Sequence, residues 1–494
     1  MKHLTELGSW IALENHSHYL RLATMSELKK NSTSREARLK LATEHVSIDF
    51  TNQRLNETTI DLLIGLANER GLKDKINALL QGDKVNRSEN RAALHTALRI
   101  FDNTTSIRID GQDIVPDVLE TRETMRKIAT KIREGKWLGF SGESITDIVN
   151  IGIGGSDFGP RFCINALSDF VTPELGFHFI SDADPFAFEN AVKTLRPETT
   201  LFIISSKSFT TRETLYNTKK ALNWLNNDRH RDKHFIAVTA NIKKAQASGF
   251  SNVLPIWNWV GGRYSLCSAI NLITCIAIGY PRFTELLMGA HSMDQHFYNT
   301  HFHENLPVML ALVGLWNINF LHIPSLLLLV YAKQLEQFVP YIQQLDMESN
   351  GKSIDNLGRS VNYATSPIIW GGPGNQAQHS YYQLLCQGTH KVAADFISTQ
   401  EFNGSLLSSF CEDKIRVLNQ GLNPPGNPNG YIPGGMPINH IQITSCSPAC
   451  FGSLIALYEH KVYVQSVLWN INSFDQPGVE SAKRLKQILD TQNA

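Results

Sequence analysis

The hydrophobic pattern divides the chain into a helical first part and a longer part in which short apolar runs alternate with helical segments. In residues 91–100 the apolar positions recur every three or four residues. A second stripe of this kind, formed by Leu119, Met125, Ile128, Ala129 and Ile132, ends at Gly135. Such spacing places apolar side chains on one face of a helix. We therefore expect the first hundred or so residues to be helical.

From residue 145 the pattern becomes that of βαβ units. Apolar, β-branched runs occupy residues 146–153, 177–180, 200–205 and 235–240, and a looser set occupies 326–332, 367–370, 394–397 and 439–444. Alternation of such runs with helical segments is typical of parallel sheets that are covered on both faces. The Pro-, Gly- and Asn-rich stretch 423–437 can only be loop.

The predicted fold is therefore α/β, with two domains that are each a mostly parallel sheet flanked by helices. A helical N-terminal segment and C-terminal helices complete it. We expect a helical segment over 1–115 that packs on the larger domain, a smaller α/β domain over 116–275, and the larger α/β domain with C-terminal helices over 276–494.

Composition narrows the classes of partner. The 494 residues carry 46 basic and 46 acidic side chains, so no net charge draws nucleic acid or an anionic membrane. The most apolar stretch, 307–332, is interrupted by polar residues and proline, so it predicts buried core instead of a membrane span. Seven cysteines without a recognisable signal peptide predict reduced thiols and a cytoplasmic location.

The first strand of the smaller domain runs into a glycine turn, GIGGSDFG. A dinucleotide-binding fingerprint would need glycine where Asp157 stands, so the Rossmann interpretation fails on spacing. Gly155 and Ser156 remain candidates for close backbone and hydroxyl contact with a ligand. A tight structural turn is an equal alternative.

A second candidate lies where the third strand ends, in SSKSFTTRET. Hydroxyls and one lysine crowd the point where a helix should begin, and Thr210 with Glu213 forms a capping-box pattern. A helix N-terminus favours an anion, and the absence of a Walker motif makes a monophosphate the better fit. The alternative is a Ser/Thr-rich helix cap.

Three further segments carry ionisable side chains. Arg263 follows two glycines, so its guanidinium could meet a developing oxyanion, or it could simply anchor a loop. A carboxylate from QQLDMESNGK, which contains Asp346 and Glu348, and the imidazole of His379, which follows a glycine loop, would form an acid/base pair if the fold brings them together. Lys483 should lie about one turn inside a C-terminal helix, where an exposed lysine is the usual alternative.

Taken together, these segments resemble the glucose-6-phosphate isomerase (phosphoglucose isomerase) family. The family's two long signatures are matched by NWVGGRYSLCSAIN and SVLWNINSFDQPGVESAK. Six further segments are similar to family blocks: GIGGSDFGP, SSKSFTTRET, QQLDMESNGK, QHSYYQLLCQGTH, YEHKV and NRSENRAALHTALR. The resemblance follows the family's order from about residue 49 to 483. The chain departs from the family in three places. Ser208 replaces the usual threonine, GGPGNQAQH replaces GEPGTNGQH, and GGMP stands where many members have GNRP.

The resemblance implies reversible isomerisation of glucose 6-phosphate and fructose 6-phosphate, in glycolysis and gluconeogenesis, through a cis-enediol intermediate. It implies that Glu348 moves the proton between C1 and C2, that Arg263 stabilises the enediolate, and that His379 and Lys483 open the ring. The sugar phosphate would be held by Gly155, Ser156, Ser206, Lys207, Ser208, Thr210, Thr211 and Thr214, with Gln344 and Gln476 also contacting substrate. The family pattern further implies a homodimer whose active sites are shared between subunits.

The residues themselves agree with a cofactor-free mechanism. A carboxylate is ionised at neutral pH and can act as the base without a metal. His16 and His18, like His301 and His303, are only two residues apart, so the helical spacing typical of metal ligands is missing. We expect no metal and no cofactor. The alternatives are a non-catalytic sugar-phosphate-binding regulator and an isomerase of a related hexose 6-phosphate.

Overall fold

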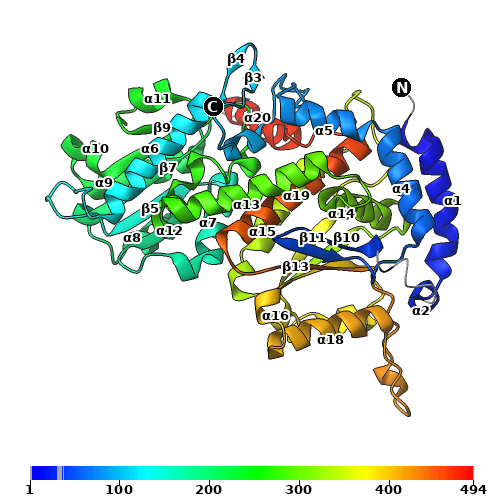
Figure 1. Cartoon of the computed structure of the whole chain (residues 1–494). Coiled ribbons are helices and arrows are strands. Elements are labelled where there is room, and N and C mark those ends of the chain that lie inside the picture. Colours follow the sequence, from blue (N-terminus) through cyan, green and yellow to red (C-terminus); the bar gives the residue numbers. More distant parts are fainter. Residues whose placement is uncertain (1–2, 30–35, 37, 493–494) are drawn as a thin grey trace.

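Two β-sheets lie side by side in the computed structural model, which describes residues 3–29, 36 and 38–492 (Figure 1). The smaller sheet has the order β6-β5-β7-β8-β9 and is wholly parallel. Its strands are β5 (Asp147–Gly152), β6 (Gly176–Ile180), β7 (Thr200–Ser205), β8 (Phe235–Thr239) and β9 (Val253–Pro255). The four runs predicted for this sheet are confirmed, and the short β9 was not predicted.

The larger sheet has the order β1-β2-β13-β12-β10-β11. Its strands are β1 (Lys40–Ala42), β2 (Val46–Asp49), β10 (Ser325–Tyr331), β11 (Ile368–Pro373), β12 (Ala393–Thr399) and β13 (Ile438–Ile443). The last four are parallel to one another and match the second predicted set, whereas β1 and β2 form an antiparallel edge. The α/β class with two mainly parallel sheets is therefore confirmed.

Helices cover both faces of each sheet because successive strand residues are apolar on both sides. In the smaller sheet, Ile203 belongs to the main core of the molecule, while its neighbours Phe202 and Ile204 belong to a separate core on the opposite face. The helices around this sheet are α6 (Val115–Arg133), α7 (Phe158–Ala166), α8 (Pro185–Val192), α9 (Arg212–Leu225), α10 (Arg231–His234), α11 (Ile242–Ala247) and α12 (Leu272–Ile278). Burial of Met125, Ala129 and Ile132 on α6 confirms the predicted stripe.

The larger sheet is covered in the same way. Leu327 and Leu329 face one core, and Leu328 and Val330 face the other. Its helices are α13 (Tyr280–Asn299), α14 (Leu306–Leu315), α15 (Phe338–Ile342), α16 (Gly374–Ala377), α17 (Tyr382–Gln387), α18 (Leu406–Gln420) and α19 (Pro448–Trp469). Nearly every residue of α19 is buried, as expected of a central helix, and its buried charged residues Glu459 and Lys461 form ion pairs. No described helix is long and apolar enough to cross a bilayer.

The N-terminal part is helical only in sections. It contains α1 (Gly8–Leu22), α2 (Met25–Lys29), α4 (Glu57–Glu69) and α5 (Leu72–Gln81), but β1 and β2 join the larger sheet. The helix predicted over 91–100 is also wrong, because only a 3₁₀ turn, His95–Arg99, forms there. Arg99 is fully buried and pairs with Asp294 at 3.0 Å and with Glu459, so long-range ion pairs override the local helical spacing. The division into 1–115, 116–275 and 276–494 stays a prediction.

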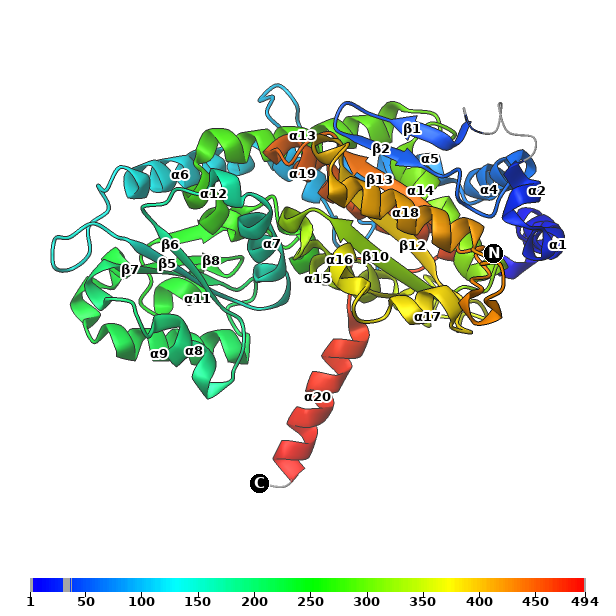
Figure 2. The ribbon, with the colours of Figure 1, turned by 90° about the horizontal axis from the view of Figure 1, so that it is seen from below.

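The C-terminal helix α20 (Pro477–Gln492) extends away from the rest of the chain (Figure 2). Val479 and Leu485 on this helix are 45% and 57% exposed. These two apolar side chains therefore contribute little stability through burial within this chain.

Candidate functional site

A cavity of about 500 Å³ lies between the two sheets, and we call it the intersheet cavity. Twelve of the fourteen predicted site residues line it. They are Gly155, Ser156, Ser206, Lys207, Ser208, Thr211, Thr214, Arg263, Gln344, Glu348, Gln476 and Lys483. Thr210 and His379 are not among its lining residues. The fold thus brings together segments that are more than 300 residues apart in the sequence.

The hydroxyl-rich loop follows β7 at the carboxyl edge of the smaller sheet, where ligands of parallel sheets bind. It leads into α9, whose N-cap is Thr211 and not the predicted Thr210, and no side chain caps the helix. The capping-box prediction is therefore wrong. Thr210 instead bonds the hydroxyl of Ser208 at 2.6 Å. The uncapped amide groups of the first helical turn are oriented to favour an anion in the cavity.

Two glycine loops meet at the floor of the cavity. A Cβ atom on Gly155 would lie 2.0 Å from the carbonyl oxygen of Gly262, so only glycine permits this approach. Buried Asn150 then joins the glycine turn to the hydroxyl loop, because it donates to the carbonyl of Ser156 at 2.9 Å and accepts from Ser205 at 2.9 Å. Asn150 was not predicted from the sequence, where it is one polar residue inside an apolar strand.

Gln344 and Glu348 lie on a π-helix, Gln343–Glu348, and both face the cavity. The side-chain amide of Gln344 donates to Oε2 of Glu348 at 3.1 Å. Asp346, between them, is fully buried and pairs with Lys461 of α19. This buried ion pair fixes the segment that carries Glu348. π-Helical segments are rare in proteins overall, but those that occur are often found at functional sites.

Arg263 is almost completely buried, and each part of its guanidinium has a partner. Nε donates to Ser349 Oγ at 2.7 Å, and Nη2 donates to the carbonyls of Ser473 at 2.7 Å and Asp475 at 3.1 Å. Nη1 donates to Gln476 Oε1 at 3.0 Å and lies 3.4 Å from Glu348 Oε2. The arginine therefore anchors a loop, as the simpler alternative held, and also presents its charge beside Glu348.

Lys352 connects the same parts and was missed by the sequence reasoning. Its ammonium group donates to the carbonyls of Ser349 at 2.8 Å, Asn472 at 2.9 Å and Asp475 at 2.9 Å. Burial lowers the pKa of Lys352 to about 8, with nearby Arg263 adding to the effect. The only sequence signal was its place at the end of QQLDMESNGK.

Lys207 does not reach freely into the cavity. Its ammonium donates to the carbonyls of Asn258 at 3.0 Å and Val260 at 2.7 Å, and burial lowers its pKa to about 8, with Arg91 as a second cause. Arg91 and Glu89 also line the cavity, and both were missed as site residues although they lie in the NRSENRAALHTALR block.

His379 lies in the exposed segment after α16 and does not line the intersheet cavity. One chain therefore does not bring His379 together with Glu348. Lys483, by contrast, lines the cavity from the base of α20, whose start at Pro477 confirms the predicted loop-to-helix change. Among the described residues, no group of three or more His, Cys, Asp or Glu side chains is arranged to hold a metal ion.

Comparison with known proteins gives a consistent result. Residues 49–413 and 427–494 match the family described as Phosphoglucose isomerase. The chain is 56% identical over 483 residues to a glucose-6-phosphate isomerase of Legionella pneumophila (strain Lens), covering 98% of this chain and 97% of that protein. It is 41% identical over 519 residues to one of Campylobacter jejuni subsp. doylei, with coverage of 99% and 95%. A crystal structure of a glucose-6-phosphate isomerase from Chlamydia trachomatis superposes with a TM-score of 0.91 at 31% identity, covering 100% of this chain and 97% of that one.

Proposed function

Because the chain belongs to the phosphoglucose isomerase family, we propose that its intersheet cavity is where glucose 6-phosphate and fructose 6-phosphate are interconverted. The single observation that carries the proposal is the position of Glu348. Its carboxylate lies beside Arg263, in a cavity that is also lined by the hydroxyl-rich loop between β7 and α9. An aldose–ketose isomerase needs these elements together: an anion site, a base and a cationic group near the reacting carbons.

The phosphate of the substrate binds the hydroxyl loop. Gly155, Ser156, Ser206, Lys207, Ser208, Thr210, Thr211 and Thr214 are the proposed ligands, and all but Thr210 line the cavity. The N-terminus of α9 supports the assignment, since its free amides and its dipole favour an anion. Thr210 would act through its hydrogen bond to Ser208.

Proton transfer follows ring opening. Glu348 removes the proton from C2 of the open-chain aldose and returns it to C1, with Gln344 holding one of the carboxylate oxygens by a hydrogen bond. The guanidinium of Arg263 is close enough to stabilise the negative charge that develops on the enediolate. Gln476, which binds Arg263 Nη1, contacts the substrate from the opposite loop.

Ring opening is assigned to Lys483 and His379. Together they supply a proton to the ring oxygen and accept one from the hydroxyl on C1 of the aldose. Because His379 lies outside the cavity of its own chain, we propose a homodimer in which this histidine serves the site of the partner subunit. The projection of α20 from the rest of the chain and its exposed Val479 and Leu485 support an additional chain packing there (Figure 2). We also propose a cytoplasmic location, to which seven free cysteines are suited.

The direct test is incubation of the purified protein with fructose 6-phosphate, read by NMR. Appearance of glucose 6-phosphate alone supports the proposal. Accumulation of mannose 6-phosphate as the main product would assign the chain to a related hexose, and binding without turnover would make it a regulator.

A further inference from the structure

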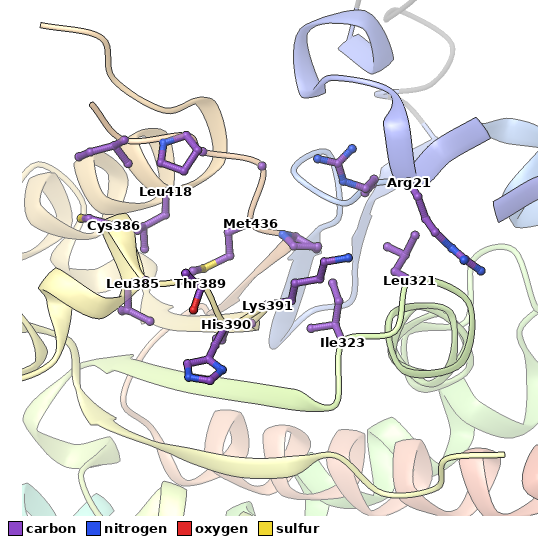
Figure 3. A pocket seen from close by; sticks show the side chains of 18 residues that line it. Arg21, Leu321, Ile323, Leu385, Cys386, Thr389, His390, Lys391, Leu418 and Met436 are labelled. Atoms are coloured by element: carbon purple, nitrogen blue, oxygen red, sulfur yellow. The ribbon is translucent and has the colours of Figure 1, made fainter. Parts of the chain in front are cut away.

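A second cavity, of about 270 Å³, lies at the other edge of the larger sheet (Figure 3). Most of its lining comes from Leu321, Ile323 and residues 388–392 and 432–437, which directly precede β10, β12 and β13. We call it the strand-start cavity. The intersheet cavity is different in kind, because it takes Ser206 and Gly155 from loops that follow β7 and β5. The two cavities share no lining residue.

The lining of the strand-start cavity has one sign of charge. It includes the basic residues Arg21, Arg54, His390 and Lys391, and no aspartate or glutamate. In a chain whose charges otherwise cancel, this is a local excess of positive charge. Clefts lined by one sign of charge concentrate ligands of the opposite sign.

Two of these cations have no carboxylate to neutralise them. Arg21 pairs with Glu14 at 3.0 Å, but within the described part of the chain neither Arg54 nor Lys391 forms an ion pair. Arg54 donates instead to the carbonyls of Leu20, at 3.2 Å, and of Ala23, at the end of α1. These bonds hold the guanidinium in place without removing its charge, and the partial burial of Arg54 adds to the cost of leaving that charge uncompensated.

Apart from Thr389, the other residues of the lining are apolar or are glycines, and they leave room for carbon atoms. Lys391 extends between Met436 and Ile323, and Leu321 lies beside them (Figure 3). Gly435 completes the wall. A Cβ atom there would lie 2.9 Å from Nη2 of Arg54, so glycine leaves the guanidinium unobstructed.

We propose that the strand-start cavity binds a small organic anion whose phosphate or carboxylate head group contacts Arg54 and Lys391. A short carbon skeleton lies against the wall formed by Leu321, Ile323 and Met436. The volume suits a molecule of a few carbon atoms, and a charge-assisted contact to each cation gives the head group its place. The site is separate from the proposed catalytic cavity and does not depend on the activity assigned to it.

The test must separate this site from the phosphate loop, which would also bind anions. The parent protein for titration calorimetry is the full-length chain with Ser206→Ala and Thr211→Ala, so that the intersheet cavity is weakened. The probes are glycerol 3-phosphate for the phosphate class and citrate for the carboxylate class. Into this parent, Lys391→Glu is introduced as the pocket variant, and Lys333→Glu, at a lysine whose side chain is 83% exposed, as the control.

We expect the parent to bind at least one probe, with one site per chain, and the probe that binds identifies the head group. Lys391→Glu should weaken that binding by about 10-fold or more, since it replaces a charged contact with repulsion. Lys333→Glu should leave it unchanged. Because Lys391 is exposed, folding should survive, and Lys391→Met provides a second variant without the reversed charge. Absence of binding of both probes to the parent, or equal affinity in the Lys391 variants, would overturn the proposal.

Discussion

Nη1 of Arg263 lies 3.4 Å from Oε2 of Glu348, although the two residues belong to segments that are 85 positions apart and follow different sheets. The contact is supported on both sides. Ser349, the neighbour of Glu348, accepts a hydrogen bond from Nε of the same arginine at 2.7 Å. In the proposed mechanism, a base and a cation fixed in this way would reach adjacent atoms of the bound sugar, as the interconversion of an aldehyde and a ketone at C1 and C2 requires.

The hydroxyl loop should act on binding more than on chemistry. Truncating Ser206 and Thr211 together to alanine removes two donors to a dianion, each worth roughly 1.5–3 kcal/mol. We expect KM for fructose 6-phosphate to rise by about 100-fold or more, with a much smaller change in kcat. Ser409→Ala, at an exposed serine of α18 outside the cavity, is the matched control. An unchanged KM in the double variant would show that the substrate's phosphate does not bind at this loop.

Lys352 should set an alkaline limit on turnover. Its pKa is lowered from 10.5 to about 8, mainly by burial, so above pH 8 the folded protein loses one donor from the group that joins the Glu348 segment to residues 472–475. We expect kcat to fall as the pH rises through about 8. In Lys352→Arg, which stays charged, that fall should move to higher pH.

The lowered pKa of Lys352 also determines how the stability of the folded protein changes with pH. Between pH 8 and 10.5 the unfolded chain holds a proton on Lys352 that the folded chain has lost, so this group makes the free energy of unfolding rise with pH over that window.

Lys207 has a similar pKa and serves as the kinetic comparison for Lys352, since Lys207→Arg should alter the pH dependence of KM and not of kcat. An alkaline limb that is identical in the wild type and Lys352→Arg would assign it to another group.

A mixed dimer tests whether the sites are shared. A chain with His379→Ala and a chain with Glu348→Gln are co-expressed, and the mixed dimer is isolated through two different tags. If His379 serves the partner's cavity, one site collects both defects and the other collects neither. Activity should then return to about half of the wild-type value, given independent sites. A mixed dimer as inactive as either parent would place both residues in the same chain's site.

The sequence predicted the parallel strands and most of the cavity because both depend on local pattern. Runs such as TLFIIS are apolar on both faces, and the residues that follow them, Ser206 among them, lie at the carboxyl edge where a ligand binds. What could not be predicted depends on distant partners. The segment around Arg99 does not form the predicted helix because Arg99 forms ion pairs with Asp294 and Glu459. Lys352 donates to the carbonyl of Asn472, which is more than a hundred residues away in the sequence.

The edges of the larger sheet show the same limit. β1 and β2 are too short and too polar to be recognised as strands, and they are defined only by the pairing of β2 with β13 and of β1 with β2. His379 could be recognised from its glycine loop and from the family resemblance, but no pattern within one chain states which subunit's cavity it serves.

The role of Glu348 is tested most directly by solvent exchange. Wild type and Glu348→Gln are each incubated with glucose 6-phosphate in D₂O, and deuterium at C2 is measured by NMR; Glu336→Gln is the carboxylate control. We expect wild type and the control to incorporate deuterium at C2, and Glu348→Gln to lose both incorporation and turnover by about 10²–10⁴-fold, the usual contribution of a general base. Exchange at C2 that continues at a near-wild-type rate in Glu348→Gln would show that another group removes the proton and would contradict the account.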